Sequence, residues 1–482
     1  MAGLTLPFTV KNVLDRDMCI GCGGCAFANP TQVSMGLDGD GQYRPTMPQK
    51  AQDPADTVCP FSDASTGIDA LSTKLFGTDL PHDDVLGFHR SVAACKVNDD
   101  GYRFGSSSGG MVSFVAAELL RRGEVDGVIH AKNQHQGQLI AYGVSDSLEE
   151  FTAHRKSAYY PVEFSQALAQ AREQGGRYAF IGIPCHIQAL RLLQEQQPDL
   201  QELVPFTLGL VCGHMKTTGF AEFLSWQLGV PPRDVAAIDF RVKATEGSAN
   251  RYATAVRSKD GKLKSRKTFE LIGTNWGHGF FQPNACNFCD DIFAETADIV
   301  FGDAWLPQFT SDPLGHNVVV VRSPLIQQIV DEATQSGAIS TTPLEAAEAV
   351  QSQAGNVRHR RRGLEVRLAD DVAQGLPVPQ RRVQPSYEHV DEARVWLIRQ
   401  RRKLSASSIA LFQSAKRNDD VRGFIKAIEP LVQAYDKKGA RTSAARMAAR
   451  LPLSMQFRIR RAIGWAKGVK GSLSSLARSK RA

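Results

Sequence analysis

Residues 178–196 read YAFIGIPCHIQALRLLQEQ and join a short apolar run to a helical pattern. The run YAFIGI has the length and composition of a buried strand. Pro184 then opens the helix, because its fixed φ suits the first helical turn, and apolar residues recur at helical spacing up to Gln196. A strand that runs directly into a helix is typical of a mostly parallel α/β sheet.

The same unit recurs on both sides of this stretch. A helix is predicted from Met111, over MVSFVAAELLRRG, and a buried strand follows at 125–131 (VDGVIHA). FTLGLV (206–211) predicts another strand, with a helix after it over 217–228. An antiparallel pair is expected around the Asp-Gly turn at 260–261, so the fold class is α/β with a mixed sheet.

Three shorter patterns complete the prediction of strands. GLDGDGQYRP (36–45) reads as two short strands around a Gly/Asp turn. DFRVK (239–243) predicts one strand whose Arg and Lys lie on the solvent face. FGDAW (301–305) predicts a buried strand that ends in a carboxylate and an indole.

Composition divides the chain into three parts. Residues 1–75 are rich in turn formers and cysteine and have too few large apolar residues for a core of their own, so a bound metal centre could organise them. Residues 85–345 carry the α/β pattern. Residues 346–482 form a helical, Arg-rich and basic C-terminal extension.

Charge and hydropathy limit the class of protein. With 42% apolar and 22% charged residues, the composition is that of a globular protein. No stretch reaches the roughly 18 apolar residues of a membrane-spanning helix, and the N-terminus lacks the pattern of a signal peptide. The net charge is +7, but residues 437–482 carry 13 Lys and Arg and no Asp or Glu. Residues 1–436 therefore have a net negative charge. We expect a cytoplasmic protein, peripheral at a membrane if its tail binds one.

Three cysteines are spaced C-x2-C-x2-C in MCIGCGGC (18–25), on a glycine-rich loop that can turn its N–H groups toward sulfur. A bacterial ferredoxin would have Cys-Pro four residues later, where this chain has Asn29-Pro30. Cys59-Pro60 is the natural substitute. This pattern favours a [4Fe–4S] cluster over a zinc knuckle or an unligated loop. The predicted ligands are Cys19, Cys22, Cys25 and Cys59.

A second set of cysteines is scattered. Cys185 and Cys212 each follow an apolar strand, and adjacent strand ends could bring them together. CNFC, with Cys286 and Cys289, would complete a four-thiolate site. Two buried structural cysteines and an unrelated zinc-like pair explain the spacing equally well. Cys95 is interpreted as a core cysteine.

Two motifs could bind a nucleotide. SSSGG (106–110) stands directly before the helix at Met111, where N–H groups suit a pyrophosphate, although an ordinary helix start explains it as well. RKSAYYPVE (155–163) offers a cation, a hydroxyl and two tyrosines that could contact phosphate and a flat ring, but a solvated turn is the simpler interpretation.

Taken in order, these pieces resemble the coenzyme F420 hydrogenase/dehydrogenase beta-subunit family, which includes 7-hydroxymethyl chlorophyll a reductase and a divinyl reductase. The resemblance covers about residues 15–345. Its carriers are CIGCGGC, the later CP, SSGG, VDGVI, KSAYYPV, FIGIPCHIQAL, LVCGH, CNFCDD, ADIVFGDAW and GHNVVVVRS.

This resemblance implies FAD and two [4Fe–4S] clusters on a mixed α/β core with a small ferredoxin-like N-terminal segment. It implies that the flavin lies along Ser108, Gly109, Gly110, Lys156, Ser157 and Tyr160. It implies that the cluster nearest the flavin is ligated by Cys185, Cys212, Cys286 and Cys289.

The expected function is therefore an oxidoreductase that passes electrons between clusters and FAD to a two-electron partner. That partner would be a deazaflavin coenzyme like F420 or a reducible organic substrate, with a ferredoxin-like protein as a possible donor. The alternative is an electron-relay subunit without a substrate of its own; a zinc-stabilised binding protein is a third interpretation. No catalytic residue is assigned; His214, Lys216 and Asp303 are candidate proton donors by position alone.

The basic tail has an apolar stripe at helical spacing, which would suit an anionic membrane surface or an acidic protein. A solvated tail is an equal alternative, and nucleic-acid binding is not expected, because no stacking platform accompanies the charge. The stripe consists of Met455, Ile459, Ala462, Ala466, Val469 and Leu473.

Overall fold

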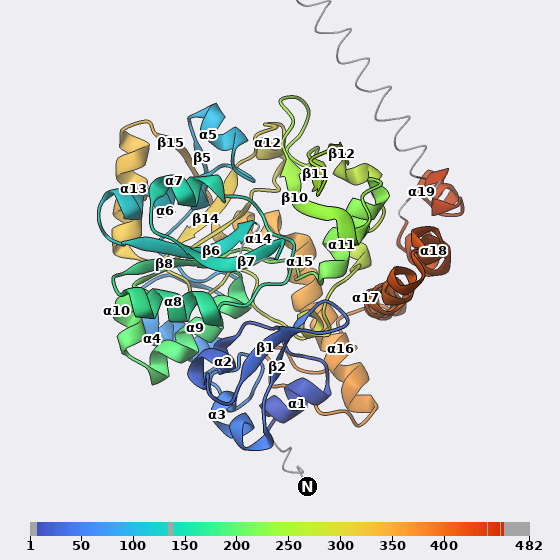
Figure 1. Ribbon diagram of the computed structural model, residues 1–482, viewed down its shortest axis with the longest axis horizontal. Coiled ribbons are helices and arrows are strands. Elements are labelled where there is room, and N and C mark those ends of the chain that lie inside the picture. The colour runs from blue at the N-terminus through green and yellow to red at the C-terminus, as the bar shows by residue number, and fades with distance from the viewer. Residues whose placement is uncertain (1–6, 134–137, 441, 454, 457–482) are drawn as a thin grey trace, which may run out of the picture.

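The computed structural model describes residues 7–133, 138–440, 442–453 and 455–456. Within these ranges, eight strands form one sheet in the order β15-β5-β14-β13-β9-β8-β6-β7 (Figure 1). Its four central strands β13, β9, β8 and β6 run parallel and the outer pairings are antiparallel, which confirms the predicted mixed α/β sheet. The strand bounds are β5 Ser91–Val97, β6 Gly127–Asn133, β7 Ile140–Ser145, β8 Tyr178–Gly182, β9 Phe206–Leu210, β13 Ile299–Asp303, β14 Asn317–Val321 and β15 Ile339–Pro343.

Helices cover both faces of this sheet (Figure 1). One face packs against α6 (Met111–Arg121) and α13 (Pro324–Gln335), and the other against α8 (Ser165–Gln174) and α9 (Pro184–Gln196). Neighbouring strand residues such as Ala179 and Phe180 fall in the two different cores, because side chains alternate along a strand. The helices predicted at 111 and 184 therefore begin where expected.

The N-terminal segment packs onto the α8–α9 face. It contains α1 (Val10–Asp15), α2 (Gly24–Ala28), the predicted hairpin β1 (Ser34–Leu37) and β2 (Tyr43–Thr46), α3 (Gln52–Asp56) and α4 (Ile68–Phe76). Phe27 and Phe61 belong to the same buried cluster as Leu190 of α9. This segment thus shares the core of the large sheet.

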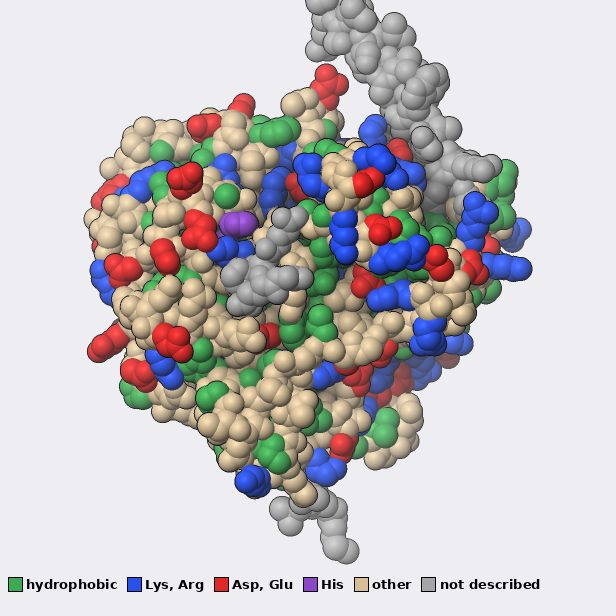
Figure 2. All heavy atoms as spheres, in the orientation of Figure 1, with side chains coloured by type: hydrophobic (Ala, Val, Ile, Leu, Met, Phe, Trp, Pro, Cys, Tyr) green, Lys and Arg blue, Asp and Glu red, His purple; other side chains and the backbone are tan. Residues whose placement is uncertain are grey.

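A second sheet, antiparallel, stands beside α11 (Thr218–Gln227). Its strands are β10 (Val235–Val242), β11 (Ala253–Ser258) and β12 (Leu263–Lys267), and the predicted turn joins β11 to β12. Figure 2 shows Lys and Arg side chains gathered on this side of the molecule. The prediction that Arg241 and Lys243 face solvent is wrong. Both are buried, because Arg241 pairs with Asp303 and Lys243 donates to three backbone carbonyls.

The last helices of the C-terminal extension lie along one side of the molecule (Figure 1). The extension comprises α14 (Ala346–Ser352), α15 (Ala354–Arg360), α16 (Arg362–Ala373), α17 (Glu392–Asn418), α18 (Val421–Gly439) and α19 (Ser443–Ala448). Leu364 and Leu368 of α16 join the core under the sheet, and Phe412 and Phe424 pack with Phe223 of α11. Of the predicted tail stripe only Met455 is described; the rest lies outside the described residues. No described helix is long and apolar enough to span a bilayer.

Candidate functional site

The second set of cysteines surrounds a cavity at the carboxyl edge of the large sheet. Cys185 stands in the first turn of α9, directly after β8, and Cys212 follows β9, the parallel neighbour of β8. Cys286 lies in the short 3-10 helix Asn284–Asn287, and Cys289 follows it. The space among these residues that no protein atom fills is about 260 Å³, part of which is open to solvent, and its walls are mostly apolar. Its lining comprises all four cysteines with Ile20, Phe61, Pro184, Met215 and Arg360.

These four thiols are buried and close together. Burial raises the pKa of Cys212 to about 12 and that of Cys286 to about 11. Burial, followed by the thiols of Cys289, Cys212 and Cys286, raises the pKa of Cys185 well above its usual value. The N–H group of Met215 donates to Sγ of Cys286 at 3.2 Å. Thiolates crowded around such a cavity would repel one another. A positively charged inorganic core would stabilise them and keep them deprotonated.

The first set of cysteines also gathers. Burial and then the thiols of Cys25, Cys19 and Cys59 raise the pKa of Cys22, and burial raises that of Cys59 to about 12. The N–H groups of Gly21 and Gly24 donate to Sγ of Cys19 and Cys22, each at 3.4 Å. Gly21 and Gly23 have φ of +66° and +89°, a backbone conformation that favours glycine and shapes the loop around the sulfurs.

The two sets are neighbours in space. Cys22 is among the groups that raise the pKa of Cys185, and Tyr142, buried between them, has its pKa raised first by burial and then by both thiols. Ile20, from the CIGC loop, lines the cavity of the second set. In the described ranges, no three His, Cys, Asp or Glu side chains are placed to hold a single metal ion.

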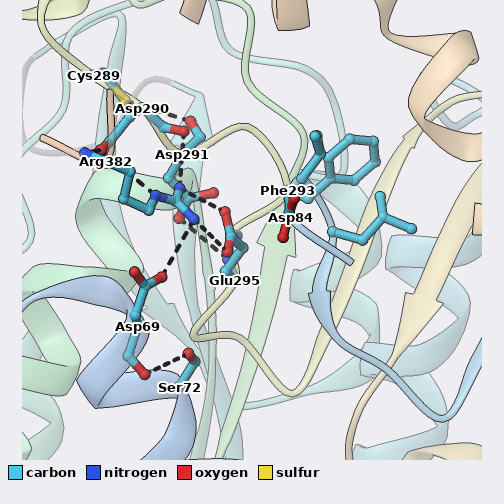
Figure 3. Close-up of polar contacts among 12 residues, drawn as sticks. Asp69, Ser72, Asp84, Cys289, Asp290, Asp291, Phe293, Glu295 and Arg382 are labelled. Atoms are coloured by element: carbon cyan, nitrogen blue, oxygen red, sulfur yellow. Dashed lines mark hydrogen bonds and ion pairs between the residues drawn. The ribbon is translucent and has the colours of Figure 1, made fainter. Parts of the chain in front are cut away.

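An acidic network fixes the loop after Cys289. Both terminal nitrogens of Arg382 donate to the carboxylate of Glu295 at 2.8 Å, and Nε lies 3.6 Å from Asp290 (Figure 3). Burial raises the pKa of Glu295 to about 7, although Arg382 opposes this rise. Asp69 of α4 lies on the other side of the same guanidinium. The C-terminal extension thus ties the CNFC loop to the N-terminal segment.

The two nucleotide-type motifs lie side by side. The N–H group of Ser157 donates to Oγ of Ser107 at 2.7 Å, and Lys156 pairs with Asp239 at 3.3 Å. Ser108 donates its hydroxyl to the carbonyl of His316. Tyr160 is half-buried, and burial raises its pKa.

The glycines of the first motif have structural reasons of their own. A Cβ at Gly109 would lie 2.7 Å from the carbonyl of Cys95 and 2.8 Å from the amide of Asn317. Gly110 caps α6 with φ of +87°. Close approach of β5, β14 and α6 therefore accounts for both glycines whether or not a nucleotide binds. Cys95 itself is buried in the core, as interpreted from the sequence.

Polar atoms without partners are found between these motifs and the cysteines. Tyr159 contacts Trp276, and Trp276 contacts His214, with ring centroids 5.2 and 4.4 Å apart. Among the residues that the structure describes, three buried side-chain atoms on or beside this row lack a hydrogen-bond partner: Nε2 of His214, Oγ1 of Thr217 and Nε of Arg241. Buried polar atoms are rarely left unpaired, so this region fits a ligand with polar edges.

The three candidate proton donors have different surroundings. Asp303 is held by two hydrogen bonds from Arg241. Lys216 donates to the carbonyl of Phe280 beneath Trp276, and burial lowers its pKa well below its usual value. His214 accepts from Arg401 at 3.3 Å, and burial lowers its pKa as well. Arg401 and Arg360 come from the C-terminal extension. Arg360 lies in the Arg-rich run at 358–362, and the sequence around both residues predicts only a helical, basic segment.

Comparison with known proteins places this arrangement in a family. The model of the coenzyme F420 hydrogenase/dehydrogenase beta subunit N-term matches residues 92–169, and that of its C terminus matches residues 175–347. The chain belongs to this family. Cys185, Cys212, Cys286 and Cys289 lie inside the matched residues, whereas the first cysteine set and the C-terminal extension lie outside them.

Several relatives carry redox names. A subunit of the F(420)H(2) dehydrogenase of Methanosarcina mazei is 22% identical over 73% of this chain and 94% of its own length. The coenzyme F420 hydrogenase subunit beta of Methanothermobacter thermautotrophicus is 22% identical over 54% of this chain and 87% of its own. A chain of the F420-reducing [NiFe] hydrogenase complex from Methanosarcina barkeri has a TM-score of 0.47 and 18% identity, covering 63% of this chain and 99% of its own.

Proposed function

We propose that this protein is an iron–sulfur flavoprotein oxidoreductase that passes electrons between two [4Fe–4S] clusters and FAD, and on to a two-electron partner. The observation that carries the proposal is the adjacency of two cysteine quartets, at Cys22 and Cys185. When bound, clusters would supply single-electron transfer and the flavin its conversion into electron pairs. Cys19, Cys22, Cys25 and Cys59 would hold one cluster, and Cys185, Cys212, Cys286 and Cys289 the other.

The chain itself supplies the surroundings. Apolar side chains such as Ile20 and Phe61 line the second quartet and would limit its contact with water. N–H groups of Gly21, Gly24 and Met215 point at sulfur, and such hydrogen bonds tune the potential of a cluster. The polypeptide would thereby hold the two proposed clusters next to each other in a largely apolar interior.

For the flavin, the proposed contacts are Ser108, Gly109, Gly110, Lys156, Ser157 and Tyr160. The hydrogen bond between Ser157 and Ser107 supports one continuous binding surface across the two motifs. The row from Tyr159 through Trp276 to His214 leads from this surface toward Cys212. Its unpartnered polar atoms are suited to the edge of a flavin ring.

The names of the relatives favour a deazaflavin coenzyme like F420 as the two-electron partner. The same names describe subunits, which favours the second candidate: a relay subunit of a larger redox complex, fed by or feeding a ferredoxin-like protein. Turnover of F420 by the isolated chain would identify the enzyme. Reduction of the clusters without F420 turnover, restored by a partner subunit, would identify the relay.

Anaerobic purification tests the proposal itself. We expect a brown protein with about eight irons, about eight acid-labile sulfides and one extractable FAD per chain. A Cys95→Ser chain is the matched control and should keep all of them, because Cys95 belongs to the core. A colourless chain that contains zinc and no iron would overturn the proposal.

A further inference from the structure

Arg360 ends α15 and is one of the most deeply buried side chains, with 1% of its surface exposed. It lines the cavity of the second quartet together with the four cysteines. Nη2 donates to the carbonyls of Cys212 and Gly213 at 2.9 and 3.0 Å. Within the described part of the chain, Nε and Nη1 are buried and have no hydrogen-bond partner.

A buried guanidinium with two unpartnered nitrogens costs free energy of folding unless an anion accepts hydrogen bonds from them. Burial lowers the pKa of Arg360, but the cysteines Cys289, Cys212 and Cys286 and then Asp291 more than reverse this, so that the pKa lies above its usual value. The groups that can balance this cation are therefore the deprotonated sulfurs and one carboxylate.

Nearby cations reinforce this charge. Arg367 is buried and Arg401 is half-buried, and Arg360 is among the groups that lower the pKa of each, after burial. The first quartet is different, because its cation, Arg44, already pairs with the carboxylates of Asp17 and Asp38. Cations are thus more numerous at the second quartet, where Asp290 and Asp291 are the neighbouring carboxylates.

We propose that Arg360 sets the potential of the second cluster, because its unpartnered Nε–H and Nη1–H groups would be available to cluster sulfur and its positive charge would lie beside the cluster. The inference rests on the proposed function and goes beyond the family, whose matched residues end at 347. A cation and N–H donors stabilise the reduced, more negative state, so they raise the potential. Reduction would add one electron to the second cluster, supplied by the proposed neighbouring cluster, with no bond formed or broken. Arg360 would therefore make the second cluster a better electron acceptor than it would be without this cation.

Redox titration followed by electron paramagnetic resonance tests this role in the holoprotein. In Arg360→Gln, we expect the midpoint of the second cluster to fall by at least the equivalent of a tenfold change in its reduced-to-oxidised ratio, about 59 mV for one electron. Arg360→Lys keeps the positive charge but loses the planar guanidinium with its several N–H donors. The midpoint of the second cluster should therefore lie between those of the wild type and Arg360→Gln. Arg358→Gln is the matched control, because Arg358 is exposed on the same helix, and its midpoint should equal that of the wild type. A Cys59→Ser chain assigns which signal belongs to which cluster.

The outcomes separate the two proposals. A wild-type chain without iron refutes the proposed function. Full iron content with an unshifted midpoint in Arg360→Gln refutes the role of Arg360 and leaves the function standing. If the Arg360→Gln protein lacks the second cluster, the test is made on Arg360→Lys. A midpoint of the second cluster below that of the wild type supports the role of Arg360, and a midpoint equal to that of the wild type overturns it.

Discussion

Cys22 lies close enough to Cys185 for its thiol to contribute to the raised pKa of Cys185. The first belongs to the N-terminal loop and the second to the first turn of α9, so the fold brings two distant segments of the chain to one place. Tyr142 is buried beside both. Electron transfer between the two cysteine quartets is the function that this adjacency would serve.

Single cysteine replacements should separate the two quartets. We expect Cys22→Ser and Cys185→Ser each to lose about four irons, because each removes a ligand from a different cluster. Iron and sulfide analysis of both chains checks this. If either chain kept about eight irons, that cysteine would not be a ligand.

Flavin binding should depend on Lys156. Its ion pair with Asp239 is partly exposed and contributes little to stability. We therefore expect Lys156→Gln to bind FAD about tenfold more weakly, the loss of about 1.4 kcal/mol that one charge-assisted contact to phosphate supplies, while its unfolding midpoint stays unchanged. Fluorescence titration of the apoprotein with FAD measures the affinity. Lys262→Gln, on the exposed turn, is the control, and equal affinities would remove Lys156 from the flavin site.

The Arg241–Asp303 pair should matter for stability. Two hydrogen bonds of 2.8 and 3.0 Å join these side chains, and Arg241 is buried. Arg241→Gln leaves Asp303 without its partner, so we expect a loss of about 3 kcal/mol in the free energy of unfolding. The double change Arg241→Met with Asp303→Leu should lose less, because no charge is left unpaired. Urea unfolding distinguishes the two, and equal losses would show that packing dominates.

Acid should destabilise the fold through His316. Burial lowers the pKa of His316 to about 4, with Asp312 opposing the shift. The unfolded chain binds a proton near pH 6.5 and the folded chain only near pH 4, so stability is lost as the pH falls between these values. After allowance for solvent screening, the loss is about 1–2 kcal/mol. His316→Gln should show a correspondingly flatter pH dependence in urea unfolding; a slope identical to that of the wild type would contradict it.

The basic tail gives one further prediction. Truncation before Lys437 removes every one of its 13 cations, so binding to vesicles with anionic lipids should be lost at low salt. Sedimentation with anionic and neutral vesicles checks this. Unchanged sedimentation would leave an acidic protein as the remaining candidate partner.

Short sequence patterns predicted much of the fold, because the residues that cause a helix or a turn to form lie within the element itself. Pro184 and the apolar spacing after it predict α9, and the Asp-Gly turn predicts the β11–β12 hairpin. The burial of Arg241 and Lys243 depends on Asp303 and on distant carbonyls, which no pattern within DFRVK reveals. The position of Arg360 could not be predicted for the same reason. In the sequence, an Arg-rich run is typical of a solvent-exposed helix face, and the structure is needed to show that Arg360 lines the cavity of the second quartet.

The ties from the C-terminal extension also bear on how such a protein matures. Arg360 closes one wall of the cavity, and Arg382 fastens the CNFC loop to the N-terminal segment. Iron and sulfide would have less access to the four cysteines once these side chains are in place. If the proposed cluster is built on this chain, we expect its assembly to be easier before α15 and the segment of Arg382 have docked, so the order in which the chain closes would affect how much protein is loaded.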